Sequence, residues 1–490
     1  MAVEPRVRRR RADITRRRPE ISLRFVVVGG SISGLATAYA LTLAGHQVTV
    51  IEQTNGKIRN SNGVTCPPNM TKVLKDWGLQ SWVDEKGVKC RDFRFICAQL
   101  GEEVGTLPFG HAEYPGKIDA EFYFLMYDDL NTLLRELTAE EGVEIRFNTQ
   151  VTDIDPDSGT VLLDGGETLK ADVIIGADGM SSMTRTVVND TGFDVEETGQ
   201  GEASEILAVG CTIPAEEIHR DPALNALLRP GEITYWLGDQ YYIAASYSSP
   251  HHLYLNLWTS LPNTDAPLLD GWYGTTDLST GQVQLRCLET GAEPRLQRLL
   301  RMVRNLTPIQ YVTRARFENA VDESATTCLV GDAGHPTMPY SIHSIALGFE
   351  DASTLLHLFS GITHPTHIPR LLAAYEEIRQ PRWDSILHAE TFLRTELSMP
   401  PGPQRDERNV FISGFKQIIK TESDNGEDDM QTMVVYNETI SLYDYDVTEA
   451  VDDWYSKWEA LLNRPTATSS TAPLWTEGHH PTSSVTVLVA

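Results

Sequence analysis

Small residues and one acidic residue near the N-terminus have the spacing of a turn that binds a dinucleotide. Residues 24–30 (RFVVVGG) form a short apolar run that ends in two glycines, and residues 31–45 carry apolar side chains at helical spacing. A second apolar run, residues 46–51, stops at Glu52. Strand, tight turn, helix, strand and then an acidic residue is the order found in the βαβ unit that binds dinucleotides.

Each of these positions has a physical role in such a unit. Gly29 permits the tight turn, Gly34 lets the helix approach the strand, and the N–H groups at the helix N-terminus attract a pyrophosphate. Glu52 can accept hydrogen bonds from the hydroxyls of a ribose. Ser31 stands where the middle glycine usually lies, and it is small enough for a close backbone approach. The alternative is an ordinary α/β crossover that binds no ligand.

Two further segments, far apart in the sequence, place a carboxylate at the end of a predicted strand. Residues 172–179 (DVIIGADG) and residues 327–336 (TCLVGDAGHP) both read as buried strands that run into turn-forming residues. Glycine at such a position leaves room for an extended polyol beside the carboxylate. The candidate residues are Asp178, Gly179, Gly331 and Asp332.

Composition and charge exclude several classes of protein. The chain has 490 residues, of which 41% are apolar, so it can bury more than one core and is not disordered as a whole. Its six cysteines form no CxxC or Cys/His cluster, so we expect neither a metal site nor a disulfide-rich fold. The net charge of −27 argues against a nucleic-acid partner, and no apolar run approaches a membrane span in length. We therefore expect a soluble, cytoplasmic enzyme without an integral membrane segment.

These segments together resemble the FAD-dependent monooxygenases of the aromatic-hydroxylase (salicylate-hydroxylase-like) family, in particular its fungal branch of secondary metabolism. The likeness continues through residues 63–69 (GVTCPPN), 375–382 (YEEIRQPR), 399–409 and 442–447. In that family the first glycine motif binds the ADP half of FAD, and the other two motifs lie along the pyrophosphate and the ribityl chain. The resemblance therefore implies FAD as the cofactor. The residues that it implies for FAD binding are Gly29, Ser31, Gly34, Glu52, Gly63, Tyr127, Asp178, Gly179, Gly331, Asp332 and Ile345.

Three positions depart from the pattern of the family. Tyr127 stands where an arginine usually contacts FAD. His343 stands where the family has a neutral glutamine, although backbone N–H groups near Ile345 can still stabilise negative charge on a reduced flavin. Gly210 stands where many fungal members carry an arginine that serves the substrate.

Residues 204–260 alternate like half-buried antiparallel strands, and their aromatic side chains suit an aromatic or polycyclic substrate. Aromatic residues at strand spacing are usually core residues, so only a few of them are expected to contact a substrate. Tyr247 is one catalytic candidate, because it matches a tyrosine of the family. His343 is the other, since an imidazole beside the flavin can act as an acid or a base; the alternative is a packed, hydrogen-bonded core histidine. The aromatic residues of the segment include Tyr235, Trp236, Tyr241, Tyr242, Tyr247 and Tyr254.

By the same resemblance we expect an α/β fold. It comprises a Rossmann-like FAD-binding domain of the glutathione-reductase type, an inserted antiparallel β-sheet domain for the substrate and a helical C-terminal region. The predicted divisions are a disordered basic arm (1–20), the first part of the FAD-binding domain (21–200), the substrate domain (201–315), the second part of the FAD-binding domain (316–400), the helical region (401–464) and a disordered tail (465–490).

The reaction that the resemblance implies is a flavin monooxygenation. NAD(P)H reduces the flavin, and O2 then forms a C4a-hydroperoxide that hydroxylates or epoxidises an aromatic, indole or polycyclic secondary metabolite. No second GxGxxG motif is present, so NAD(P)H is expected to dock transiently. Two alternatives remain open: a flavin oxidase or dehydrogenase that forms no hydroperoxide, and a degenerate flavoprotein that acts as a non-redox cyclase, isomerase or scaffold.

Overall fold

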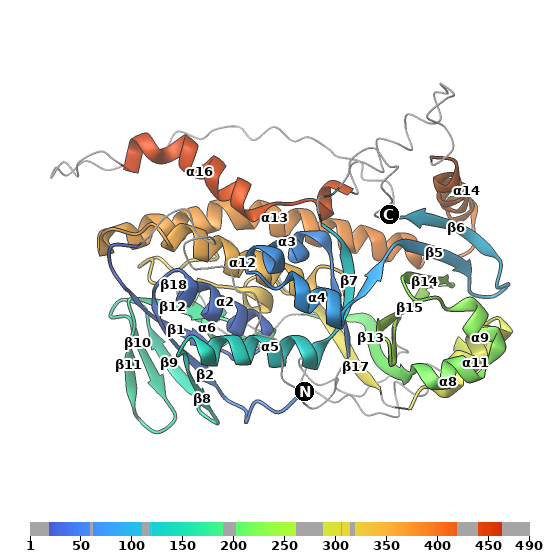
Figure 1. Ribbon diagram of the computed structural model, residues 1–490, viewed down its shortest axis with the longest axis horizontal. Coiled ribbons are helices and arrows are strands. Elements are labelled where there is room, and N and C mark those ends of the chain that lie inside the picture. Colours follow the sequence, from blue (N-terminus) through green and yellow to red (C-terminus); the bar gives the residue numbers. More distant parts are fainter. Residues whose placement is uncertain are drawn as a thin grey trace.

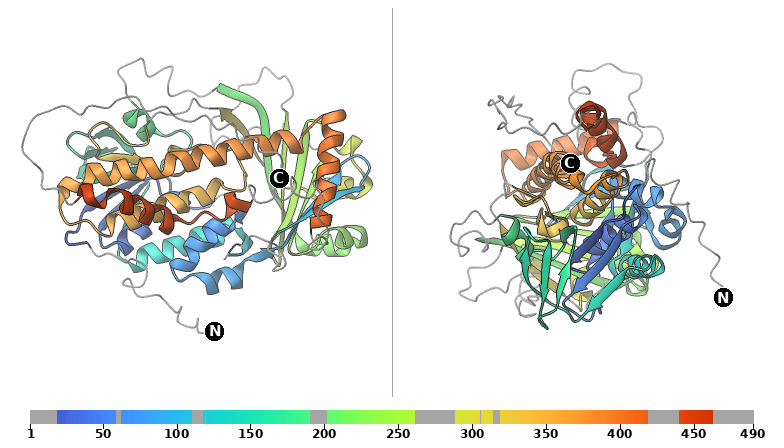
Figure 2. Two further views of the ribbon diagram at one scale, coloured as in Figure 1. Left: turned by 90° about the horizontal axis from the view of Figure 1, so that it is seen from above. Right: turned by 90° about the vertical axis from the view of Figure 1, so that its left-hand side faces the viewer.

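The computed structural model describes residues 19–58, 62–109, 118, 120–189, 202–260, 288–304, 306–313, 319–418 and 440–462. Residues 1–18 of the predicted basic arm and the whole predicted tail (465–490) lie outside the described residues. A parallel sheet and a larger mixed sheet lie toward opposite ends of the molecule, and the long helix α13 (Ile368–Leu397) runs from one to the other (Figures 1 and 2). None of the described helices is both long enough and apolar enough to cross a membrane.

The parallel sheet has the strand order β18-β12-β1-β2-β8. Phe25 and Val27 of β1 face a core shared with helices α2 (Ile32–Leu43) and α12 (Ser344–Phe359), whereas Val26 and Val28 face a second core on the other side. A parallel strand covered on both faces has no polar alternation, which explains the continuous apolar run after Arg24. The strands are β1 (Arg24–Val28), β2 (Gln47–Glu52), β8 (Glu144–Phe147), β12 (Val173–Gly176) and β18 (Thr327–Leu329).

The larger sheet has the order β17-β13-β16-β15-β14-β5-β6. The prediction of antiparallel strands within residues 204–260 is confirmed by the pairing of β13 with β16, β16 with β15 and β15 with β14. Two strands from residues 92–108 complete this sheet, because β5 pairs in parallel with β14. The predicted boundary at residue 200 assigned residues 92–108 to the FAD-binding domain, whereas their two strands belong to the larger sheet. The strands are β5 (Asp92–Cys97), β6 (Glu103–Pro108), β13 (Glu202–Pro214), β14 (Glu232–Leu237), β15 (Tyr241–Ser249), β16 (His252–Ser260) and β17 (Thr307–Thr313).

Two small sheets and a set of helices cover these layers. One small sheet, β11-β10-β9, supplies the second core against β1, and the other has the order β3-β7-β4. Helix α14 (Pro403–Ile418) packs on β6, and α16 (Val447–Leu462) packs on α12. The remaining strands are β3 (Gly63–Cys66), β4 (Val88–Cys90), β7 (Phe122–Met126), β9 (Val151–Asp155), β10 (Thr160–Leu163) and β11 (Thr168–Lys170). Further helices are α3 (Pro68–Asp76), α4 (Gln80–Lys86), α5 (Tyr127–Glu140), α6 (Met183–Val188), α8 (Ala215–Arg220), α9 (Pro222–Leu227) and α11 (Pro294–Met302).

Candidate functional site

A cavity of about 720 Å³ lies at the carboxyl ends of β1, β2 and β12 and continues to the N-terminus of α12 and the larger sheet. Glu52 and Arg135 line it beside the parallel sheet, whereas Tyr254 and Tyr340 line it beside the larger sheet. Ligands of open α/β sheets bind outside the carboxyl ends of the strands. The cavity therefore joins the predicted dinucleotide turn to the predicted substrate sheet.

The glycine turn after β1 has no space for side chains. Gly29 has a φ of +107°, and a Cβ on this residue would lie 2.3 Å from the carbonyl oxygen of Ala177. A Cβ on Gly34 would lie 2.0 Å from the carbonyl oxygen of Gly29. This close packing brings the N-terminus of α2 to the cavity, which Gly30 and Ser31 line. The positive end of the helix dipole thus faces the space where a pyrophosphate would lie.

Glu52 ends β2 and is only 7% exposed, although it lines the cavity. Its Oε2 accepts a 2.8 Å hydrogen bond from the backbone N–H of Gly30. Its Oε1 accepts bonds of 2.7 Å from the backbone N–H and 2.6 Å from the hydroxyl of Thr54. The carboxylate therefore joins the glycine turn to the loop after β2. Because each carboxylate oxygen has two acceptor positions, Glu52 keeps capacity for a donor from a ligand.

Ser31, which replaces the usual middle glycine of the turn, and Tyr127, which replaces the arginine of the family, meet in this cavity. The hydroxyl of Tyr127, at the start of α5, lies 3.1 Å from the hydroxyl of Ser31. Burial raises the pKa of Tyr127, so its hydroxyl stays protonated and can donate a hydrogen bond at neutral pH. One turn further along α5, Asn131 is 3% exposed, and within the described residues its Oδ1 has no hydrogen-bond partner. An unpartnered buried acceptor in a cavity wall fits a hydroxyl or N–H group of a ligand.

Asp178 lines the cavity and also orders the segment that follows β12. Its Oδ2 accepts a 3.0 Å bond from the backbone N–H and a 3.1 Å bond from the hydroxyl of Thr184, and its Oδ1 accepts from the hydroxyl of Ser182. Ser182 in turn caps helix α6 by accepting from the backbone N–H of Arg185. Asp178 thus holds the short helix in place beside the cavity.

Arg185 is a residue that the predicted site did not include. It is 3% exposed, and its guanidinium donates to the carbonyl oxygens of Met180, Asp332 and Ala333. These bonds tie the segment after β12 to the loop after β18. The signal for this role is the spacing of Ser182 and Arg185 behind Asp178, which puts Ser182 at the N-cap of a short helix and Arg185 within that helix.

The loop after β18 brings Asp332 to the cavity wall. Gly331 precedes it with a φ of +59°, and a Cβ there would lie 2.5 Å from the hydroxyl oxygen of Ser33 on α2. A left-handed residue in such a narrow space has to be glycine. Asp332 is therefore turned toward the cavity by the backbone on either side of it.

The other part of the cavity lies between the N-terminus of α12 and the larger sheet. Ser344 and Ile345, in the first turn of α12, line it together with Tyr254 and Tyr340. The hydroxyl of Tyr340 donates a 2.8 Å hydrogen bond to the carbonyl oxygen of Thr307. Burial raises the pKa of both tyrosines, so these walls are uncharged aromatic surfaces.

Tyr340 also takes up space beside Gly210 of β13. A Cβ on Gly210 would lie 2.7 Å from Cζ of the Tyr340 ring. Tyr340 has a φ of +62°, a left-handed conformation that is uncommon for a bulky residue. The position where family members carry an arginine is therefore closed by an aromatic ring.

Most residues predicted for FAD binding line this one cavity. Gly34 and Gly331 are not among its lining residues, but they lie directly behind it, against Gly29 and Ser33. The lining residues are Gly29, Ser31, Glu52, Gly63, Tyr127, Asp178, Gly179, Asp332 and Ile345.

Neither residue predicted to be catalytic is among those that line the cavity. Tyr247 faces the opposite side of the larger sheet, where its ring lies 6.1 Å from that of His219 on α8. Side chains of a strand alternate between faces, and Tyr254 of the neighbouring strand is the tyrosine on the cavity side. The expected contact of Tyr247 with a substrate is therefore wrong, because its side chain lies on the face of the sheet away from the cavity.

His343 precedes α12 and is turned into the protein, where it is 3% exposed. Its backbone N–H donates a 2.8 Å hydrogen bond to Oε1 of Glu390, and its Nδ1 lies 3.3 Å from the same oxygen. Its ring packs on Tyr443 with 5.0 Å between the ring centroids. This placement corresponds to the alternative of a packed, hydrogen-bonded core histidine, with Glu390 and Tyr443 as its partners.

The donors, acceptors and shape of the cavity fit FAD. The Cβ-free turn at Gly29 and the N-terminus of α2 suit a pyrophosphate, and Glu52 suits a ribose. The unpartnered Oδ1 of Asn131 lies in the same wall, and Asp332 offers an acceptor to a polyol. The N-terminus of α12 provides the partial positive charge that favours a reduced, anionic flavin.

Comparison with known proteins agrees with this fit. Residues 23–231 match the family described as FAD binding domain. Over 404 residues the chain is 28% identical to FAD-dependent monooxygenase OpS4 of Beauveria bassiana, a match that covers 81% of this chain and 90% of the relative.

Two solved structures share the fold. The crystal structure of CtdE in complex with FAD and a substrate has a TM-score of 0.69 at 15% identity, covering 90% of this chain and 100% of the other. A substrate complex of salicylate hydroxylase has a TM-score of 0.68 at 17% identity, covering 88% and 97% respectively. At these identities the likeness concerns the fold alone.

Proposed function

Because this chain is an FAD-dependent monooxygenase related to the aromatic hydroxylases, we propose that it uses NAD(P)H and O2 to hydroxylate or epoxidise an aromatic, indole or polycyclic secondary metabolite. The observation that carries the proposal is the continuity of the cavity. One space contacts the glycine turn at Gly29, the carboxylates of Glu52 and Asp332, and the aromatic wall at Tyr254 and Tyr340. A cofactor and a flat apolar substrate can therefore occupy adjoining parts of it.

The residues of the chain would hold the cofactor in one orientation. Glu52 would bind the ribose of the adenosine, and the hydroxyls of Ser31 and Tyr127 would lie beside the pyrophosphate. Asp332 would bind the ribityl chain, and the N–H groups near Ile345 would stabilise negative charge on the ring. When bound, FAD would supply the electron transfer and the activation of oxygen.

The substrate would lie between the N-terminus of α12 and the larger sheet. Tyr254, Tyr340, Leu306 and Pro308 line this part with apolar or aromatic surface, which excludes water and favours stacking of a ring system. The Tyr340 ring covers Gly210, where many family members carry an arginine, so we expect the part of the substrate that contacts Tyr340 to be neutral. Among the described residues that line this part, none has a basic side chain that could bind a carboxylate.

NAD(P)H would dock transiently, because the sequence contains one dinucleotide turn and FAD would occupy it. The segment after β12, which Asp178 and Arg185 order, borders the cavity on the side where such a reductant would approach.

The test is to purify the full chain, measure FAD occupancy from the flavin absorbance and follow NAD(P)H oxidation with a panel of neutral aromatic, indole and polycyclic compounds. We expect FAD to copurify, some panel compounds to accelerate NAD(P)H oxidation, and the product to contain one oxygen atom from 18O2. Consumption of NAD(P)H that yields only hydrogen peroxide, or a compound that is oxidised without gaining 18O, would instead support an oxidase or dehydrogenase. A chain that takes up no FAD would refute the proposal.

A further inference from the structure

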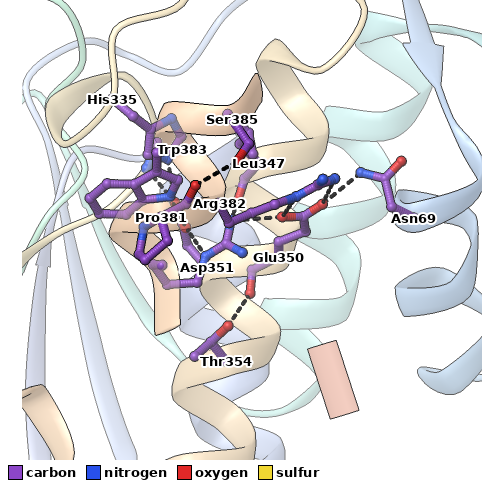
Figure 3. A network of polar contacts seen from close by, with 12 residues as sticks. Asn69, His335, Leu347, Glu350, Asp351, Thr354, Pro381, Arg382, Trp383 and Ser385 are labelled. Atoms are coloured by element: carbon purple, nitrogen blue, oxygen red, sulfur yellow. Dashed lines mark hydrogen bonds and ion pairs between the residues drawn. The ribbon is translucent and has the colours of Figure 1, made fainter. Parts of the chain in front are cut away.

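The carboxylate of Asp351, in the middle of α12, lies between two segments that are far apart in the sequence. Its Oδ2 accepts hydrogen bonds from the backbone N–H of Gly331 at 2.9 Å and from Nε2 of His335 at 2.6 Å. Its Oδ1 accepts from Nε of Arg379 at 2.8 Å and from Nε1 of Trp383 at 3.0 Å. One oxygen thus serves the loop after β18, and the other serves helix α13 (Figure 3).

This arrangement requires an ionised carboxylate. Asp351 is fully buried, which alone would raise its pKa, but the neighbouring His335 and Arg379 outweigh burial and hold the pKa at about 2. An ionised carboxylate only accepts hydrogen bonds, so all four groups around Asp351 act as donors. Each carboxylate oxygen therefore accepts from two donors of a single segment.

The loop that Asp351 holds is the one that carries Asp332 to the cavity. Gly331 stands before Asp332 and His335 stands three residues after it, so Asp351 contacts the loop on both sides of the cavity residue. From the opposite direction, Arg185 donates to the carbonyl oxygens of Asp332 and Ala333. The backbone of the loop is thus fixed by buried charged groups of both signs.

We propose that Asp351 is a positioning residue for the cofactor: it couples helix α13 to the loop of residues 331–335 and thereby sets the place of Asp332 against FAD. The inference rests on the proposed function, because it takes Asp332 as a contact of the bound cofactor. Asp351 itself is not among the residues that line the cavity. Its effect on FAD therefore passes through the loop.

An amide cannot replace this carboxylate. Asparagine has one acceptor oxygen and one NH2 group, so it can accept from the loop or from α13 but not from both. The NH2 group would face the N–H donors of the other segment, and one pair of buried donors would lose its acceptor. The Asp351→Asn variant therefore tests the coupling without a change in side-chain size.

Glu350, the residue before Asp351, offers a matched control. It is equally buried and ionised, and its carboxylate binds Asn69 at 2.7 Å, Arg382 at 3.0 Å and Arg379 at 2.8 Å (Figure 3). Among the described residues, its carboxylate binds these three side chains and makes no hydrogen bond to the loop of residues 331–335. Glu350→Gln therefore disturbs the same buried network on the side away from Asp332.

The experiment compares the wild-type chain with Asp351→Asn, Glu350→Gln and His335→Phe. For each protein we would measure the melting temperature, the Kd for FAD by titration of the apoprotein, and the visible circular dichroism of the bound flavin. We expect Asp351→Asn to raise the Kd by about tenfold or more and to alter the flavin spectrum. Glu350→Gln should lower the melting temperature while the Kd stays within about twofold of wild type. His335→Phe, which removes the donor at Nε2 but keeps a ring beside Trp383 and the bond from Gly331 to the carboxylate, should raise the Kd by a smaller factor.

The outcomes separate the inference from the proposed function. If the wild-type chain binds no FAD, both fall. If it binds FAD and Asp351→Asn shows the wild-type Kd and spectrum, or if both carboxylate variants raise the Kd equally, the positioning role of Asp351 is refuted. If Asp351→Asn does not fold, His335→Phe decides the question, because this variant loses only the side-chain hydrogen bond between the loop and Asp351. An unchanged Kd and spectrum in His335→Phe then counts against the inference.

Discussion

The hydroxyls of Ser31 and Tyr127 lie 3.1 Å apart and bridge the glycine turn and the first turn of α5. Ser31 stands where the family has a glycine, and Tyr127 stands where it usually has an arginine. Both departures would weaken a cofactor site if each stood alone. Together they form a hydrogen-bonded pair in the wall of the cavity, so each of the two hydroxyls has a partner within the protein.

This pair predicts a non-additive effect of substitution. Ser31→Ala and Tyr127→Phe each remove one hydroxyl, and each should reduce the free energy of unfolding by about 0.5–1.5 kcal/mol. The double variant should lose little more than either single variant, because the same hydrogen bond is missing in all three. Urea unfolding of the four proteins measures the coupling. Effects that add up fully would show that the two hydroxyls do not act together.

Glu52 is expected to be required for FAD retention. Removal of its carboxylate in Glu52→Ala takes an acceptor from the ribose and also frees Gly30 and Thr54, whose N–H groups it now binds. A loss of about 1.5–3 kcal/mol per charge-assisted hydrogen bond corresponds to at least a tenfold weaker FAD complex. The variant should therefore purify largely without flavin absorbance.

Asp172→Asn is the control for Glu52→Ala, because Asp172 binds the exposed Arg24 at 2.8 Å and does not line the cavity. Equal FAD occupancy in both variants would refute the assignment of Glu52.

Local sequence patterns were sufficient for the cofactor end of the cavity. The turn at Gly29, the acid at Glu52 and the strand end at Asp332 each depend on a few neighbouring residues, and a single geometry is compatible with each spacing. The continuous apolar run after Arg24 also predicted a buried parallel strand, because a strand that is covered on both faces has apolar residues at consecutive positions.

The substrate end could not be predicted in the same way. Strand β15 is buried along its whole length, so its sequence does not indicate which of its faces meets the cavity. The prediction put Tyr247 on the cavity face, whereas it lies on the opposite face. His343 contacts Glu390 and Tyr443, which lie far from it in the sequence. The pairing of β5 with β14 is equally non-local, and no spacing within residues 92–108 predicts it.

Gly210 and Tyr340 should be coupled in stability. A Cβ at position 210 would lie 2.7 Å from the Tyr340 ring, whose hydroxyl is held by Thr307, so Gly210→Ala should cost about 1–3 kcal/mol of unfolding free energy. The change to alanine at Tyr340 removes the obstructing ring, and Gly210→Ala should then cost less. The measurement is a double-mutant cycle by urea unfolding, with KM for an active aromatic compound as a second readout. Equal costs of Gly210→Ala in both backgrounds would mean that the ring does not occupy this space.

Buried His46 predicts a loss of stability in mild acid. Burial lowers the pKa of His46 to about 4, with its Nδ1 accepting from the backbone N–H of Leu23 and its Nε2 facing the carbonyl oxygen of Phe359. The unfolded chain binds a proton at this residue below about pH 6.5, whereas the folded chain does so only near pH 4. The contribution of His46 is therefore complete above pH 6.5, and about 3 kcal/mol is lost as the pH falls toward 4. The difference between the unfolding profiles of wild type and His46→Gln over this range measures it. A difference that does not change with pH would contradict the burial of a neutral imidazole.

His343 is the residue at which a structural role and a catalytic role make opposite predictions. Its ring packs on Tyr443, and its backbone N–H bond to Glu390 survives any change of side chain. If this packing is its whole role, His343→Phe keeps most of the ring contact, and His343→Gln loses it at a cost of about 1–2 kcal/mol in unfolding free energy. FAD affinity, the flavin midpoint potential and the pH dependence of turnover should then stay at wild-type values in both variants.

A proton-transfer role predicts the reverse order: His343→Phe would be the more damaging change, and the pH profile of turnover would shift in both variants. Because His343 is turned away from the cavity and toward Glu390, we expect the first pattern, and a shifted pH profile in His343→Gln would refute it.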